Sequence, residues 1–198
     1  MLMDKKNDNS FFAMLSRMKY IERWALMRNS LRENVSEHSL ETAVVAHALA
    51  IIGNCRLGMD YDIEYIALLA MYHDCTEIIT GDMPTPVKYY NTEIKDAYKE
   101  IEVNAAKNLL SRLPEDMALE YEKYLLPKED ASVMKLIKAA DKISALIKCI
   151  EEEKTGNREF NHAKESTFKA IRELECKEAE IFCEEFVPEY EKTLDELN

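Results

Sequence analysis

The chain has 198 residues, and its 47% hydrophobic and 32% charged residues are typical of one globular domain with an apolar core. Its net charge of −12 argues against binding a nucleic-acid polymer, because such binding requires many basic groups that neutralise phosphates. With only 4 Gly and 5 Pro, the sequence favours long helices over many short strands. The longest apolar block, Ala43–Ile52, is too short to span a bilayer. We therefore expect one all-helical domain over residues 1–198.

The cellular location follows from the first residues and from the cysteines. The opening sequence MLMDKKNDNS has no apolar core of the kind found in export signals. The five cysteines show no CxxC spacing. Reduced thiols in the cytoplasm are the simplest interpretation, so we expect a cytoplasmic protein.

The first third of the chain predicts a short helix, an irregular stretch and a long central helix. Ser10 can cap the short helix. The stretch 19–34 is less regular and contains the only tryptophan. The central helix begins near Ser36 and is apolar all round from Ala43 to Ile52 except at His47, which we expect to be a core histidine. Five basic residues lie in or just before the irregular stretch: Arg17, Lys19, Arg23, Arg28 and Arg32.

The rest of the chain predicts a series of helices. They are expected to begin at Asp60 or Asp62, after Asn91 and at Pro114, and to cover 129–153 and 160–186. From Glu151 onward there are fifteen acidic and seven basic residues, so residues 160–198 form an acidic C-terminal segment. The basic residues near the N-terminus could dock a small anion, although a solvated helix face is the alternative interpretation.

One apolar helix, Ile63–Tyr72, ends in the pair His73-Asp74. A core helix has no packing use for an imidazole and a carboxylate side by side, whereas zinc, manganese, iron or cobalt accepts both as ligands. Glu77 follows four residues after His73 and shares its helix face. A surface glutamate near a helix end is the alternative for Glu77. A glycine and two prolines then reverse the chain beside the pair.

Two further residues complete a candidate metal site within residues 38–141. Asp141 falls on the apolar stripe of the 129–153 helix, where a carboxylate is costly unless it is bound to an ion or paired with Lys or Arg. His38 lies in the first turn of the central helix, and His47 lies about 180° further round that helix and cannot face the same ion. The candidate ligands follow the order H…HD…D, with separations of 35 and 67 residues: His38, His73, Asp74 and Asp141.

This order is similar to that of the HD-domain superfamily of metal-dependent phosphohydrolases, which are helical bundles with these four residues on a divalent ion. Three stretches, RWALMRNSLRENVSEHSLETAVVAHALA, ALLAMYHDCTEIITGDMPTPVKY and KAADKISALIKCIEE, closely resemble the bacterial 5′-deoxynucleotidases of the YfbR type. The similarity runs from about Phe11 to the C-terminus. It implies a cytoplasmic homodimer that hydrolyses deoxynucleoside 5′-monophosphates with one divalent ion, typically cobalt or manganese.

The resemblance also implies roles for individual residues. Glu77 matches the catalytic acid or base, and Arg23 matches a group that contacts the phosphate. An arginine can grip phosphate with two parallel hydrogen bonds. Trp24 is either a core residue or a rigid wall that excludes the ribose 2′-OH, and these two roles are compatible. The implied metal ligands are His38, His73, Asp74 and Asp141. The implied substrate-binding residues are Arg23, Trp24, His38, Asp74, Asp82, Met83, Pro84, Thr85 and Asp141.

Three other functions compete with this one. The same fold could serve a dNTP triphosphohydrolase or a hydrolase of cyclic or alarmone nucleotides, but a triphosphate calls for more basic residues than the one strip provides. A non-catalytic nucleotide-binding regulator would not need the full ligand set together with Glu77. A purely structural helical protein leaves Asp141 and the His73-Asp74 pair unexplained.

Overall fold

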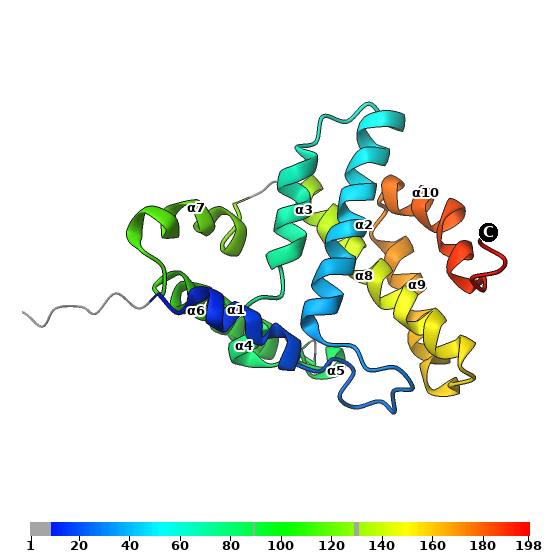
Figure 1. The fold of residues 1–198 in the computed structure, drawn as a ribbon, viewed down its shortest axis with the longest axis horizontal. Helices are drawn as coiled ribbons and strands as arrows, with labels where there is room; N and C mark the ends of the chain where they lie inside the picture. The colour runs from blue at the N-terminus through cyan, green and yellow to red at the C-terminus, as the bar shows by residue number, and fades with distance from the viewer. Residues whose placement is uncertain (1–8, 89, 129–130) are drawn as a thin grey trace, which may run out of the picture.

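The computed structural model describes residues 9–88, 90–128 and 131–198, and over these ranges the fold is all-helical, as predicted (Figure 1). An isolated antiparallel bridge joins Glu22 to Asn34. The α-helices are α1 (Phe11–Leu15), α2 (Val35–Arg56), α3 (Ile63–Tyr72), α4 (Glu77–Thr80), α5 (Thr85–Lys88), α6 (Thr92–Leu110), α7 (Glu115–Leu125), α8 (Ala131–Lys154), α9 (Asn161–Glu173) and α10 (Lys177–Glu185). The 3-10 helices are η1 (Ser16–Tyr20), η2 (Arg158–Phe160) and η3 (Val187–Glu191).

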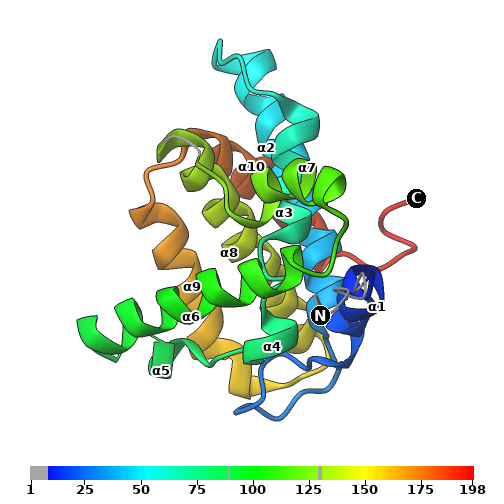
Figure 2. The same ribbon diagram turned by 90° about the vertical axis from the view of Figure 1, so that its left-hand side faces the viewer.

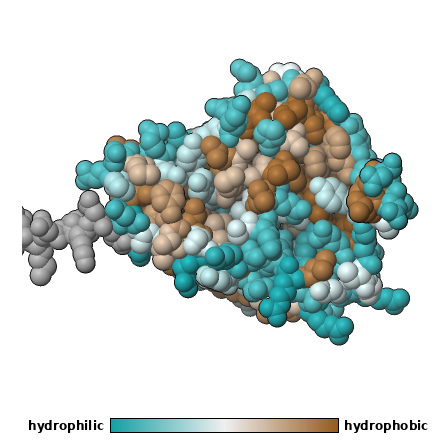
Figure 3. All heavy atoms as spheres, viewed as in Figure 1, coloured by the Kyte–Doolittle hydropathy of each residue, from teal (hydrophilic) through white to brown (hydrophobic). Residues whose placement is uncertain are grey.

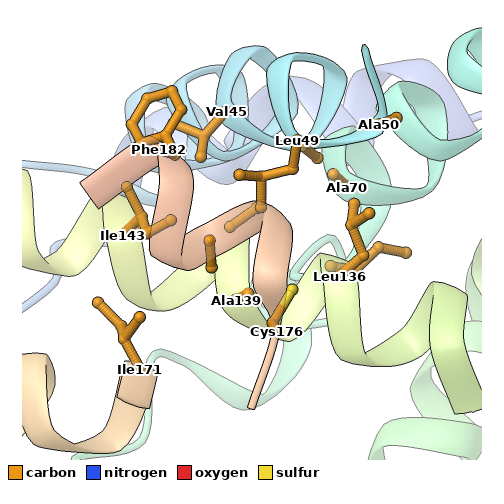
Figure 4. Packing of buried hydrophobic residues seen from close by; sticks show 14 of the residues in the cluster. Val45, Leu49, Ala50, Ala70, Leu136, Ala139, Ile143, Ile171, Cys176 and Phe182 are labelled. Atoms are coloured by element: carbon orange, nitrogen blue, oxygen red, sulfur yellow. The ribbon is translucent and has the colours of Figure 1, made fainter. Parts of the chain in front are cut away.

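The main core lies where α2 packs against α3 and α8, with α9 packed on α8 and α10 packed on both α2 and α8. Figure 4 shows Val45 and Leu49 of α2 facing Leu136 and Ile143 of α8, with Phe182 of α10 beside them. Burial of these aliphatic side chains removes apolar surface from water, which is the main force that holds the helices together. The crossing of α2, α3 and α8 is therefore the rigid part of the molecule.

A second, smaller core joins α1, α6 and α7 to one end of this crossing (Figure 2). Phe11, Val35 and Leu109 are fully buried in it, and Cys75 is 1% exposed. Because Cys75 directly follows the His73-Asp74 pair, this core fixes the turn that carries the pair against the main core. The two cores thus meet at the predicted site.

The helix starts follow from side chains that cap them. Asn34, rather than Ser36, caps α2: its side chain accepts hydrogen bonds from the backbone N–H groups of Ser36 and Glu37. The carboxylate of Glu37 accepts from the backbone N–H of Asn34 in return, which completes a capping box. Asp62 caps α3 and Asn91 caps α6, as predicted. Both caps place a side-chain oxygen where it accepts from an otherwise unpaired N–H.

Two predictions about helices are wrong. The helix expected over 160–186 is two helices, α9 and α10, and Glu175 between them adopts a left-handed backbone with φ of 49°. The charge pattern continues across this break without a glycine or proline to mark it. His47 is exposed rather than in the core, because α2 packs on only part of its circumference. Of the periodic run 129–153, residues 129 and 130 lie outside the described ranges.

None of the helices in the described part of the chain combines the length and the apolar character needed to cross a bilayer.

Candidate metal centre and substrate pocket

The His73-Asp74 pair lies in the turn between α3 and α4. The backbone N–H of Cys75 donates to the carbonyl of Tyr72 at 3.1 Å, and that of Glu77 donates to the carbonyl of Asp74 at 3.0 Å. These short-range bonds keep the chain coiled after the last residue of α3. The side chains of His73 and Asp74 therefore project from the end of an apolar helix toward α2 and α8.

Four side chains from three parts of the fold converge at this point: His38 of α2, His73 and Asp74 of the turn, and Asp141 of α8. One ligand atom from each lies within 4.8 Å of the others. Nε2 of His38 is 3.2 Å from Oδ1 of Asp141 and 3.5 Å from Oδ2 of Asp74, while Nε2 of His73 is 3.1 Å from that Oδ2. Ligand atoms around one ion, with bonds of about 2.0–2.2 Å, lie about 3–3.5 Å apart. The cluster therefore has the dimensions of a metal site.

The orientation of His73 supports the same interpretation. Its Nδ1 lies 2.6 Å from the carbonyl oxygen of Ala70, an acceptor, so Nδ1 carries the proton and donates. Its Nε2 is buried and has no hydrogen-bond partner. A buried imidazole nitrogen that faces two carboxylates, and that binds a divalent ion once it has lost its proton, suits a metal ligand.

His38 is oriented by a chain of hydrogen bonds that sequence analysis missed. The hydroxyl of Ser144 in α8 donates to Oε2 of Glu41 at 2.7 Å, so its oxygen is left to accept from Nδ1 of His38 at 3.0 Å. Nδ1 of His38 is then a donor to Ser144, and Nε2 faces the two aspartates. Ser144 lies one turn after Asp141 and Glu41 one turn after His38, but an ordinary serine and glutamate give no signal of this role in the sequence.

The charges in the cluster depend on one another. Burial alone would raise the pKa of Asp141, but the imidazoles of His38 and His73 hold it far below its usual range. The pKa of Asp74 is likewise well below its ordinary value, since His73 and His38 outweigh the effect of burial. For His73, burial would lower the pKa, but Asp74 and Asp141 raise it to about 9. Both carboxylates are thus ionised at neutral pH and able to bind a cation.

Arg23 lies directly beside the cluster. Its Nη1 is 3.5 Å from Oδ2 of Asp74 and 3.9 Å from Oδ1 of Asp82, and its side chain is 11% exposed. Burial would lower its pKa, but Asp74 and Glu33 raise it, so it remains a cation. A buried guanidinium with terminal nitrogens at the edge of the metal cluster is suited to bind a phosphate on the same ion.

Trp24 follows in a strained backbone conformation, with φ of 59°, which is uncommon for a residue other than glycine. Its indole N–H donates to Oε2 of Glu33 at 2.6 Å, and its ring lies 5.3 Å from that of Phe160. It is half-buried rather than a core residue. Strain of this kind is common at ligand sites, where the surrounding structure holds it in place.

A buried ion pair in α8 anchors the loop that carries Arg23 and Trp24. Glu152 accepts from the backbone N–H groups of Ser30 and Leu31, and Nζ of Lys148 lies 2.5 Å from its Oε1. Burial would raise the pKa of Glu152, but these donors and Asn157 lower it to about 2. Sequence analysis missed this anchor, although a Lys and a Glu four residues apart near the apolar stripe of α8 are a visible signal.

Glu77 lies in the first turn of α4, is 5% exposed and leaves Oε2 without a hydrogen-bond partner. Burial and the nearby carboxylates of Asp74 and Asp82 raise its pKa to about 9. At neutral pH, Glu77 therefore keeps its proton in the metal-free protein. This is the state that a proton donor needs.

The second predicted substrate segment, residues 82–85, runs from the end of α4 into α5. Asp82 faces Arg23, and burial raises its pKa. Met83 and Pro84 are half-buried, while Thr85 is exposed at the first residue of α5. Of this segment, Asp82 lies beside the cluster, 3.9 Å from Nη1 of Arg23.

The chain is similar to known 5′-deoxynucleotidases over nearly its whole length. A family model described as 5′-deoxynucleotidase YfbR-like matches residues 10–190. A 5′-deoxynucleotidase of Vibrio cholerae is 46% identical over 192 residues, which cover 96% of this chain and 99% of that protein. One from Pectobacterium atrosepticum is 46% identical over 197 residues, with 97% of each chain covered.

Solved structures show the same fold. An HD-domain phosphohydrolase from Listeria innocua matches with a TM-score of 0.80 at 26% identity, covering 91% of this chain and 88% of that one. The HD phosphohydrolase of cyanophage S-2L, solved with dA and one catalytic Zn²⁺, shares the fold with a TM-score of 0.65 at 18% identity, covering 89% of this chain and 96% of that one. The match of the family model over most of the chain, together with the identity to full-length relatives, shows that the chain belongs to the YfbR-like 5′-deoxynucleotidase family.

Proposed function

We propose that this protein is a metal-dependent 5′-deoxynucleotidase that hydrolyses deoxynucleoside 5′-monophosphates to deoxynucleoside and phosphate. The observation that carries the proposal is the position of Arg23, with Nη1 3.5 Å from Oδ2 of the candidate ligand Asp74. The guanidinium of Arg23 and an ion in the adjacent metal site would together present two positive charges to one phosphate group. The proposal covers the whole chain, residues 1–198, as one domain.

The residues present fit a single divalent ion. Two imidazole nitrogens and two ionised carboxylates face one point, and Nε2 of His73 lies 3.1 Å from Oδ2 of Asp74, where an ion can replace its proton. The proposed ligands are His38, His73, Asp74 and Asp141. When bound, such an ion neutralises phosphate charge and lowers the pKa of water toward neutrality. We propose cobalt or manganese as the ion, since mixed nitrogen and oxygen ligands suit both.

Arg23 binds and orients the phosphate in this proposal. Its guanidinium is held by Glu33 at Nε, at 3.4 Å, and its Nη1 is directed toward Asp74 and Asp82. Two terminal nitrogens can form parallel hydrogen bonds to two phosphate oxygens. This grip neutralises the charge that repels an attacking oxygen nucleophile.

Glu77 is the proposed proton donor to the leaving 5′-oxygen. It is buried, its pKa is raised to about 9 by burial and by Asp74 and Asp82, and its Oε2 has no partner. A carboxylic acid held protonated at neutral pH can deliver that proton as the phosphorus–oxygen bond breaks. Replacement by Gln keeps the shape of the side chain but removes the acid. The Glu77→Gln variant should lose about 10²–10⁴-fold in kcat.

Selection of deoxyribose is assigned to Trp24. Its indole is fixed at the N–H by Glu33 and packs on Phe160, so it is a rigid wall next to the phosphate-binding Arg23. A rigid wall near the sugar rejects a 2′-hydroxyl by steric clash. Asp82 is the residue proposed to read the other sugar hydroxyls, and Met83, Pro84 and Thr85 are proposed to complete that side of the substrate site.

We also propose a cytoplasmic homodimer. All five cysteines are free, which suits a reducing compartment. The outer face of α2 exposes a stripe of aliphatic side chains at helical spacing, with Leu40 60%, Val44 61% and Ile51 37% exposed. Figure 3 shows apolar surface gathered on the face where Figure 1 places α2 and α3. A second copy is the proposed occupant of this stripe. Val44→Glu should then yield a monomer in light scattering, whereas Leu119→Glu, an exposed apolar site on α7, should not.

The proposed reaction is tested by its products. Metal-loaded protein is given dAMP, AMP and dATP in separate reactions, and orthophosphate and tripolyphosphate are measured. We expect orthophosphate from dAMP, little from AMP and no tripolyphosphate from dATP. Tripolyphosphate from dATP without release from dAMP would favour a triphosphohydrolase. Failure to cleave any of the three would leave a cyclic- or alarmone-nucleotide hydrolase or a nucleotide-binding regulator.

A further inference from the structure

A buried glutamate, Glu33, lies opposite Arg23 where the loop between η1 and α2 closes. The backbone N–H of Arg23 donates to the carbonyl of Glu33 at 2.9 Å, and that of Val35 donates to the carbonyl of Ile21 at 2.9 Å. These two bonds flank the antiparallel bridge between Glu22 and Asn34. The backbone therefore fixes Glu33 directly beside Arg23, independently of any side-chain contact.

The carboxylate of Glu33 binds both members of the substrate-contacting pair. Its Oε2 accepts from Nε1 of Trp24 at 2.6 Å and lies 3.4 Å from Nε of Arg23. The side chain of Glu33 is 10% exposed and that of Arg23 is 11% exposed. A carboxylate removed from water to this extent is costly unless it is paired. The partners of Oε2 are the residue proposed to hold phosphate and the residue proposed to exclude ribose, while Oε1 lies 3.9 Å from Nδ1 of the candidate ligand His38.

These contacts determine which parts of the two side chains remain available to a substrate. On Arg23, Glu33 occupies the Nε edge, while Nη1 points to Asp74 and Asp82 at 3.5 and 3.9 Å. On Trp24, Glu33 holds the N–H end and Phe160 packs against the ring. Loss of the carboxylate would free rotation of the indole and leave a buried guanidinium with one counterion fewer.

We propose that Glu33 is a positioning residue that holds Arg23 and Trp24 as one unit, so that phosphate binding and sugar selection depend on the same carboxylate. This inference rests on the proposed 5′-deoxynucleotidase function and deepens it. Glu33 does not touch the substrate. It acts through the two residues that do.

The two hydrogen bonds can be separated by substitution. Glu33→Gln keeps an oxygen that accepts from the indole N–H but removes the charge that faces Arg23. Glu33→Ala removes both interactions. Glu22→Ala is the matched control, because Glu22 lies in the same loop, is exposed and pairs only loosely with Arg32 at 3.9 Å.

The experiment measures kcat and KM for dAMP and AMP on the metal-loaded full-length variants, together with the emission of the only tryptophan. For Glu33→Gln we expect KM to rise about tenfold for both substrates, with the dAMP-to-AMP preference and the emission maximum kept. For Glu33→Ala we expect the same rise in KM and a preference for dAMP over AMP that is smaller by about tenfold or more. The emission of Trp24 should be shifted to the red and less polarised. Glu22→Ala should match the wild type in every readout.

Two results would overturn the inference. One is a Glu33→Ala protein with the wild-type dAMP-to-AMP preference and wild-type tryptophan emission. The other is an equal loss of kcat on both substrates with unchanged KM, which is the result of a merely structural defect. If the wild type itself releases no phosphate from dAMP, the proposed function fails on its own, and Trp24 emission, which needs no substrate, still decides whether Glu33 holds the indole.

Discussion

The hydroxyl of Ser144 lies 3.0 Å from Nδ1 of His38 and donates its own proton to Glu41. Because the hydroxyl is a donor to the carboxylate, it can only accept from the imidazole. Nδ1 of His38 therefore carries a proton, and Nε2 faces Asp74 and Asp141. An interaction of this kind outside the ligand set fixes the orientation of a ligand before the ion arrives.

Loss of this hydroxyl should weaken the metal site. In Ser144→Ala, Nδ1 of His38 loses its acceptor, and the imidazole is free to adopt the other tautomer. We expect metal affinity to fall about 10–100-fold, measured by calorimetric titration of metal-stripped protein. The control is Ser111→Ala, since the Ser111 hydroxyl donates only to the backbone carbonyl of Asn108 on the surface. Equal affinities for Ser144→Ala and the wild type would contradict this role.

Metal binding should become tighter as the pH rises. In the metal-free protein, Asp74 and Asp141 outweigh burial and raise the pKa of His73 to about 9, so the imidazole carries a proton that the ion must displace. Below that pH, the affinity should rise about tenfold per pH unit for each proton released. Titration with Mn²⁺ between about pH 6 and pH 8, in buffers of different ionisation enthalpy, measures this slope. A pH-independent affinity would show that His73 does not ligate.

The sequence predicts the site better than it predicts the surroundings of the site. The all-helical fold and the family were identified from the HD pair and its flanking residues, because ligands at helix ends have a recognisable order along the chain. Glu33 and Ser144 could not be predicted, since each acts on a residue brought close only by folding. The break at Glu175 was missed because local charge pairs continue through it, and His47 was misplaced because an apolar helix need not be buried on all sides.

The anchor at Glu152 should be important for stability. Glu152→Gln removes the charge that faces the buried Lys148 and weakens the bonds to Ser30 and Leu31. Leaving one member of a buried ion pair without its partner costs about 3–5 kcal/mol. The free energy of unfolding measured in urea should therefore fall by that amount. Glu153→Gln on the exposed side of the same helix turn is the control. No difference between the two variants would contradict the anchor.

The carboxylate of Glu152 should also make the free energy of unfolding depend on pH in the acid range. The pKa of Glu152 is lowered from an ordinary value of 4.5 to about 2 in the folded protein. Its stabilising contribution is therefore complete above about pH 4.5 and is lost as the pH falls toward 2. The difference in unfolding free energy between the wild type and Glu152→Gln should shrink over this window.

Glu77 should reduce the stability of the metal-free protein at neutral pH. Its pKa is raised from 4.5 to about 9, so the folded state disfavours the ionised carboxylate. The cost grows as the pH rises from about 4.5 to 9. Metal-free Glu77→Gln should consequently melt at a higher temperature than the wild type, by a margin that increases over this range. A margin that stays constant with pH would show that Glu77 ionises freely.

The most direct test of the central claim is phosphate release from dAMP by metal-stripped protein, with and without added cobalt or manganese, in the wild type and in Asp141→Ala. If the four residues form the metal site, the stripped wild type releases no phosphate without an ion, and either ion restores the release. Asp141→Ala releases no phosphate at the same ion concentration. Full release by the stripped wild type, or by Asp141→Ala, would contradict this claim.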